Sequence, residues 1–172
     1  MQPYVQTEMA SFTSKDGTTP FKLLLDLELL DWTAVYLGVS HGWVNRENVR
    51  DFAALQLADG IKTEGAATLA DNESLSFDDL ILLVFKQIKK PGALASYEIW
   101  RFALLLYIRQ SDASIEKKLT QIHRVFVQFN YPNDMFHCTD REACDTTSLA
   151  ALNDLIEEMR PRFKRHPRKL KH

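Results

Sequence analysis

The residues best suited to chemistry gather in one stretch, Phe126 to Cys144, which also holds Asp134, His137 and Cys138. Carboxylate, imidazole and thiolate groups bind zinc, and a thiolate beside an imidazole can act as a nucleophile. Structural zinc sites, however, have ligands paired at short spacings, whereas here His and Cys are adjacent and the second Cys follows after five residues. Catalysis would also need an orienting carboxylate and a lowered thiol pKa, which the sequence does not indicate. The stretch therefore predicts a helix end and a loop, without a metal site or a catalytic residue.

Other constellations give no stronger sign of an enzyme. The chain contains no GxGxxG, GxxxxGK[ST], HExxH or GxSxG motif. Carboxylates adjoin at Asp78 and Asp79 and at Glu157 and Glu158, but sequence neighbours diverge around a helix and cannot act together across one substrate. Helix capping explains Asp78 and Asp79, and a solvent-exposed helix face explains Glu157 and Glu158. We expect neither enzyme activity nor a cofactor.

The elements that position these residues are predicted to be helices. Apolar residues recur at helical spacing, while no run alternates with a period of two. Asp31, Asn45, Ser76 and Ser96 are candidate N-terminal caps, as is Asp112 or Ser114. The predicted helices span residues 21–30, 32–39, 47–57, 76–90, 96–108, 115–129 and 147–160, with a further short one around 66–70. The sequence thus predicts an all-α, single compact domain of about six or seven helices.

The chain divides by composition into an irregular N-terminal arm (1–20), the helical domain (21–160) and a basic tail (161–172). A length of 172 residues fits one domain. The sequence has neither an apolar run of about 18 residues nor the layout of a secretory signal, so we expect a cytoplasmic protein that does not engage membranes. In a reducing compartment both cysteines are expected to be free thiols.

Charge is distributed unevenly along the chain. Residues 160–172 carry seven basic side chains and no acidic one, which leaves 14 basic against 23 acidic residues in the rest of the chain. An acidic body repels nucleic acids and anionic membranes and attracts basic protein surfaces, so its expected charged partner is another protein. The tail could contact nucleic acid weakly, in a salt-dependent way.

Two segments carry a family resemblance. They are Leu30-Asp-Trp-Thr-Ala-Val-Tyr-Leu-Gly38 with Gly42-Trp-Val44, and Val125-Phe-Val-Gln-Phe-Asn-Tyr-Pro-Asn-Asp-Met135. With the helices between them, they resemble an uncharacterised family of small bacterial helical proteins suggested to be immunity proteins of polymorphic toxin systems. The resemblance spans residues 28–136 and brings no catalytic residues with it. The chain departs from the pattern after Met135, where a cysteine-containing loop, a helix and a basic tail follow.

Together these features favour an immunity-type protein that neutralises a cognate toxin by stoichiometric binding. An acidic surface would speed its encounter with a basic, nuclease-like toxin. The acidic residues expected to face solvent and bind the partner are Asp71, Glu73, Asp78, Asp79, Asp154, Glu157 and Glu158. The alternative is a generic helical interaction or scaffold protein that touches nucleic acid through its tail. Neither the toxin nor the oligomeric state follows from the sequence.

Overall fold

The computed structural model describes residues 12, 15–89, 93–140 and 145–163 of the chain. Within these ranges the protein is helical and has no strand, which confirms the all-α prediction. The described residues form nine α-helices, more than the six or seven predicted. One of the additional helices, α4 (Ala66–Ala70), was expected around residues 66–70 as a further short helix outside that count. The other, α8 (Phe136–Thr139), has four residues, too few for a helical period to show in the sequence.

Contacts divide the chain into two compact units, residues 1–100 and 101–172. No change of composition marks this boundary, because it falls inside a helix, α6 (Ala93–Gln110). No helix in the described part of the chain combines the length and apolarity needed to cross a membrane.

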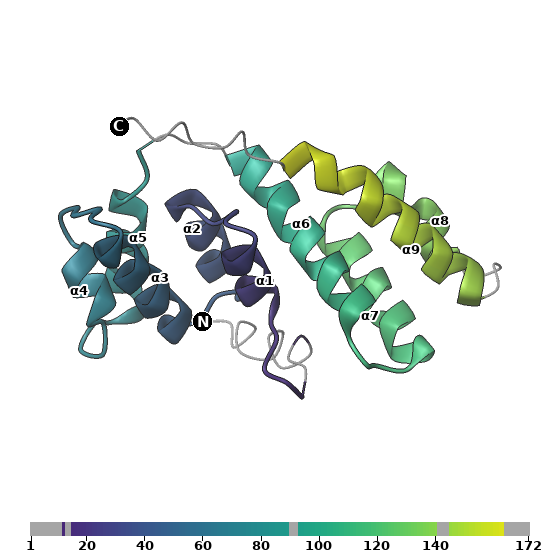
Figure 1. The fold of residues 1–172 in the computed structure, drawn as a ribbon, viewed down its shortest axis with the longest axis horizontal. Coiled ribbons are helices and arrows are strands. Elements are labelled where there is room, and N and C mark those ends of the chain that lie inside the picture. Colours follow the sequence, from purple (N-terminus) through teal and green to yellow (C-terminus); the bar gives the residue numbers. More distant parts are fainter. Residues whose placement is uncertain (1–11, 13–14, 90–92, 141–144, 164–172) are drawn as a thin grey trace. The chain divides into compact units, whose positions relative to one another are not determined.

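The first unit contains five helices and the start of α6 (Figure 1). Helix α2 lies against α5, α3 lies against α4, and α4 also contacts α5. Phe12, which lies in the predicted irregular arm, is almost fully buried. The five helices are α1 (Pro20–Asp26), α2 (Trp32–Ser40), α3 (Arg46–Ala58), α4 (Ala66–Ala70) and α5 (Phe77–Lys86).

Most of the predicted helix starts are confirmed by side-chain caps. The Asp31 carboxylate accepts the Ala34 N–H at 2.8 Å, and the Ser76 hydroxyl accepts the Asp79 N–H at 3.1 Å. Asn45 forms a reciprocal capping box with Asn48. Each of these polar side chains satisfies an amide that the helix leaves without a carbonyl partner.

Helix α1 ends earlier than predicted, at Asp26 rather than Leu30. The Glu28 N–H donates to the Leu25 carbonyl and the Leu29 N–H donates to the Leu24 carbonyl, which is the hydrogen-bond pattern of a Schellman motif. This motif requires a left-handed residue, and Glu28 takes that position with φ of 56°. Periodicity could not reveal this end, because the apolar residues continue beyond it.

The α5–α6 boundary also differs from the prediction. Helix α5 ends at Lys86 instead of Lys90, and the side chain of the next residue, Gln87, is buried and bonds to another segment. Its Nε2 donates to the Glu64 carbonyl at 2.7 Å, and its Oε1 accepts a hydrogen bond from the Thr63 hydroxyl. Helix α6 begins at Ala93, so Ser96 lies within the helix rather than capping it.

Tryptophans and a glycine hold the end of α2 in the core. The Trp100 indole N–H donates to the Ala34 carbonyl at 2.7 Å, and the Trp43 and Trp100 rings lie 5.4 Å apart. A Cβ on Gly38 would lie 2.3 Å from Val44 Cγ2 and 2.6 Å from Trp100 Cζ2, so only glycine fits there. The first segment of the family resemblance is therefore a packing motif.

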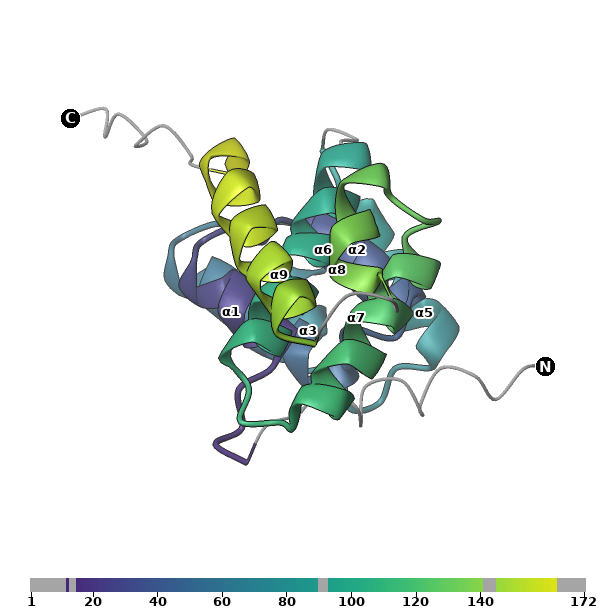
Figure 2. The same ribbon diagram turned by 90° about the vertical axis from the view of Figure 1, so that its right-hand side faces the viewer.

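The second unit is built from the rest of α6 and the helices that follow it. Helix α8 lies against α7 and α9 (Figure 2). Six consecutive apolar residues of α6, Phe102 to Tyr107, are buried, as expected for a central helix. The other elements are α7 (Ile115–Gln128), the 3-10 helix η2 (Asn133–Met135), α8 (Phe136–Thr139), α9 (Asp145–Met159) and the 3-10 helix η3 (Arg160–Phe163).

The end of α7 explains the second segment of the resemblance. The Tyr131 N–H donates to the Phe126 carbonyl at 2.8 Å, and the two rings meet edge to face at 5.2 Å. Asn130 takes a left-handed conformation, which asparagine tolerates, with φ of 60°. Tyr131 is left-handed as well, with φ of 58°, and the Pro132 that follows it disfavours right-handed helical geometry at this position. This sharp turn leads the chain into η2.

Candidate protein-binding site

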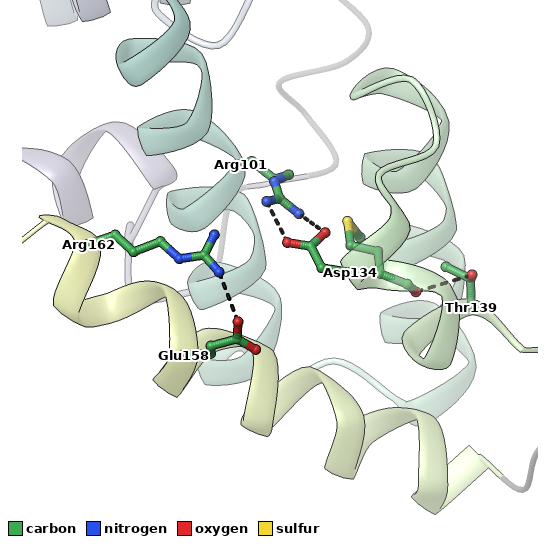
Figure 3. A network of polar contacts seen from close by, with 6 residues as sticks. Arg101, Asp134, Thr139, Glu158 and Arg162 are labelled. Atoms are coloured by element: carbon green, nitrogen blue, oxygen red, sulfur yellow. Dashed lines mark hydrogen bonds and ion pairs between the residues drawn. The ribbon is translucent and has the colours of Figure 1, made fainter.

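The Phe126 to Cys144 stretch, which contains the candidate metal ligands, contributes a carboxylate to a structural ion pair. Both Asp134 carboxylate oxygens accept hydrogen bonds from the Arg101 guanidinium, at 2.6 and 2.9 Å (Figure 3). His137 is exposed, whereas Cys138 is buried and free, and Cys144 lies outside the described residues. No three His, Cys, Asp or Glu side chains within the described ranges are placed to hold a metal ion.

The electrostatics of this cluster favour an inert thiol. Burial raises the pKa of Cys138 to about 11, the negative charge of Asp134 adds to the rise, and Arg101 opposes it. Burial alone would raise the pKa of Asp134, but the hydrogen bonds and charge of Arg101 outweigh burial and lower it. At neutral pH the pair is therefore ionised and the thiol is protonated, which suits a structural role.

Arg101 is the residue of this cluster that sequence reasoning missed. Its side chain is only 3% exposed and lies in the middle of an apolar helix. A lone arginine within such a run is a signal, because a buried guanidinium needs an anionic partner. The sequence therefore indicates that Arg101 requires an anionic partner. It does not identify that partner as Asp134, which lies 33 residues away.

Most of the predicted acidic residues in the second unit form ion pairs with arginines of the same unit. Glu157 lies 2.7 Å from Arg109 and 3.4 Å from Arg160. The hydrogen bond from Arg109 is the main cause of the lowered pKa of Glu157. Glu158 accepts from Arg162 at 2.9 Å (Figure 3). All three predicted residues of α9 are exposed, but neighbouring arginines offset the charges of Glu157 and Glu158. Asp154 is the one of the three that forms no such ion pair with the described part of the chain.

Two of the predicted acidic residues of the first unit, Asp71 and Glu73, lie on the connection from α4 to α5, and the other two, Asp78 and Asp79, lie in the first turn of α5. Buried contacts hold this connection: Arg46 Nη1 donates to the Asn72 carbonyl at 2.6 Å and to the Leu75 carbonyl at 2.8 Å. The Asn72 side chain donates back to the Arg46 carbonyl at 3.0 Å. Exposed acidic residues on this connection are thus fixed in place by a hydrogen-bonded frame.

Three of these four carboxylates have no ion-pair partner among the described residues. Glu73 lies 3.8 Å from Arg50, a distance typical of a weak surface pair. Asp71, Asp78 and Asp79 are exposed and make no such pair, although Asp79 also accepts a hydrogen bond from the Ser76 hydroxyl. The free negative charge of the predicted site is therefore concentrated where α4 ends and α5 begins.

One of these carboxylates, Asp78, lines an exposed apolar groove, which sequence reasoning also missed. It has a volume of about 450 Å³ and is lined by Tyr36 of α2 and by Asp78, Ile81, Leu82 and Phe85 of α5. The rings of Tyr36 and Phe85 meet at 5.5 Å, while Leu82 and Phe85 remain 50% and 56% exposed. We call this feature the α2–α5 groove.

A signal for the groove was present in the sequence of α5. The helix reads Phe-Asp-Asp-Leu-Ile-Leu-Leu-Val-Phe-Lys, with apolar residues on more than one face. Leu80 and Val84, which are four residues apart and so share one face of the helix, are fully buried. Leu82 and Phe85 lie off that face, and apolar residues that cluster away from the core face are typical of a second contact surface.

Comparisons with known proteins place the chain in a family. No curated protein and no solved structure gives a significant match. Residues 22–160, however, match the family described as "Uncharacterized protein conserved in bacteria (DUF2247)". The match includes both segments of the resemblance, the α2–α5 groove and the Arg101–Asp134 pair. The chain therefore belongs to this bacterial family, whose description assigns no activity.

Proposed function

We propose that this protein is a cytoplasmic immunity-type protein that neutralises a cognate bacterial toxin by binding it stoichiometrically. The observation that carries the proposal is a concentration of exposed carboxylates, Asp71, Asp78 and Asp79, which have no ion-pair partner among the described residues and lie near the end of α4 and the start of α5. One of them, Asp78, lines an apolar groove. A surface of this composition suits a basic protein, such as a nuclease-like toxin, better than a small substrate.

The distribution of charge between the units supports the same partner class. Residues 1–100 carry 14 acidic and 8 basic side chains, whereas residues 101–172 carry 9 acidic and 13 basic ones. The first unit therefore has a net charge of −6, and its field would attract a basic protein. Of the two groups of acidic residues predicted from sequence, this proposal assigns the binding role to the group in the first unit.

The experiment begins with tagged protein as bait in lysate of a source bacterium, washed at low salt and at about 0.5 M salt, where surface charges are strongly screened. The captured protein is then expressed in cells with and without this chain. We expect growth arrest by the captured protein alone, rescue by co-expression, and a 1:1 complex of the purified proteins.

Charge-reversal variants connect rescue to the acidic surface. Asp71→Lys with Asp78→Lys should weaken the complex and slow its association, because both changes oppose a basic partner. The matched control is Asp26→Lys with Asp59→Lys, which alters net charge equally at two exposed acids elsewhere in the unit. Absence of any captured protein that arrests growth, or equal effects of both pairs of substitutions, would contradict the proposal.

A further inference from the structure

The α2–α5 groove is built from residues that the core of the first unit does not need. On α5, Leu80 and Val84 are buried and face the interior, so they anchor the helix. Leu82 and Phe85 lie on another side and leave half or more of their surface in water. Adjacent exposed apolar side chains that contribute little to the core mark a surface for binding another molecule.

Charged residues of opposite sign lie at the two ends of α5, along which the groove runs. The first turn of the helix contains Asp78 and Asp79, while Lys86 lies in its last turn. Asp78 itself lines the groove, one turn before Leu82 and two turns before Phe85. At 1.5 Å per residue these separations are about 6 and 10 Å along the axis. A ligand would therefore meet a carboxylate at one end and an aromatic ring at the other.

This arrangement selects among possible occupants. A second copy that bound through the same face would bring another acidic surface against Asp78, and close like charges oppose such association. Anionic lipids and nucleic acids are disfavoured by the same charge. A protein segment with an apolar side chain and a nearby lysine or arginine satisfies both ends of the groove.

We propose that the α2–α5 groove binds a segment of the partner protein that places an apolar side chain against Leu82 and Phe85 and a cation against Asp78. The inference rests on the proposed function and specifies which contacts give it affinity. Buried aromatic and aliphatic contacts supply most of the energy in such interfaces, and the charge pair at the edge sets the orientation.

The probe is a synthetic helical peptide that carries lysine followed by leucine one turn later and tryptophan two turns later. Its control replaces lysine with glutamate. Titration into the full-length, ¹⁵N-labelled protein should shift the resonances of Tyr36, Ile81, Leu82 and Phe85, and the glutamate peptide should bind at least about tenfold more weakly. No binding, or shifts confined to other regions, would overturn the proposal.

Two variants distinguish binding in the groove from non-specific hydrophobic binding. Leu82→Gln should weaken binding of the lysine peptide by about tenfold or more, as expected for a central contact. Leu55→Gln is the matched control, because Leu55 is a 44% exposed leucine on α3 of the same unit. Both variants should keep the wild-type melting temperature, since neither side chain is buried. Equal weakening by both substitutions would also overturn the proposal.

The captured toxin distinguishes this proposal from the proposed function. If co-expression rescues growth and Leu82→Gln rescues as well as wild type, at equal affinity, the groove is not the binding site although the immunity function holds. If no toxin is neutralised but the lysine peptide binds in the groove, the immunity function fails and the docking surface remains.

Discussion

Arg101 and Asp134 show how a single pair of side chains determines the role of a whole segment. Arg101 is buried and forms two hydrogen bonds with a carboxylate that is 31% exposed. A bidentate pair of this kind is strong and geometrically specific. It fixes the chain just after the left-handed turn at Tyr131, and it accounts for the aspartate in a stretch that first suggested metal binding.

Removal of the carboxylate should destabilise the second unit. Asp134→Ala leaves a buried guanidinium without its bidentate partner, and we expect a loss of about 2–3 kcal/mol, below the usual range for fully buried pairs because Asp134 is partly exposed. Urea unfolding measures the change. Asp154→Ala, which removes an exposed acid that forms no ion pair with the residues the structure describes, is the control and should change stability by less than about 0.5 kcal/mol. Equal effects would show that the pair contributes no stability.

The same pair predicts how stability depends on pH. The pKa of Asp134 is lower in the folded protein than in the unfolded chain. Its contribution is therefore fully present above the unfolded value of about 4 and is lost as the pH falls through the lower, folded value. Urea midpoints measured from about pH 6 down to about pH 3 should fall less steeply for Asp134→Asn than for wild type. Parallel curves for the two proteins would contradict this prediction.

At the scale of elements, the tightest contact is the one between α2 and Trp100. Gly38→Ala would place a methyl group within 2.3 Å of Val44 and 2.6 Å of Trp100, both of which are buried. We expect a loss of about 2–3 kcal/mol from overpacking, measured by thermal and urea unfolding. Ser40→Ala, at an exposed position of the same helix, should be nearly neutral. A neutral Gly38→Ala would mean that the α2 end is not held as the structure shows.

The end of α1 gives a prediction of opposite sign. Glu28 takes a left-handed conformation that costs a side-chain-bearing residue about 1–2 kcal/mol. Glu28→Gly removes that cost, and after the greater entropy of the unfolded chain is allowed for, stability should rise by about 0.5–1 kcal/mol. Glu47→Gly, in the first turn of α3, should lower stability instead. The two urea midpoints should therefore move in opposite directions.

Elements set by local chemistry could be predicted from the sequence, and those set by distant contacts could not. Asp31, Asn45 and Ser76 cap the helices expected of them, because a cap needs only an amide two or three residues away. Helix α5 ends where the Gln87 side chain bonds to the 63–64 segment, a contact that no local pattern reveals. The acidic residues of the proposed site could be named from the sequence because charge is visible there. The groove beside them depends on which face of α5 the core leaves uncovered.

For the whole molecule, the uneven charge distribution allows the two functional hypotheses to be compared. If the acidic first unit binds a toxin, removal of the basic residues 164–172 should leave inhibition within about twofold of wild type. If the protein instead acts on nucleic acid through its tail, the same truncation should abolish a binding whose affinity falls steeply with salt. Toxin rescue and nucleic-acid binding, measured on the same truncated protein, check this prediction.

Helix α6 joins the two units through consecutive residues, since Trp100 belongs to the core of the first and Arg101 begins the second. A genetic crossover at this boundary would divide a helix and separate residues that anchor different units. The units are therefore expected to be inherited together rather than exchanged as independent cassettes. Leu82 and Phe85, which lie away from α6 in sequence and outside the core, are free of that constraint. Diversification within the family is expected to be fastest at such positions.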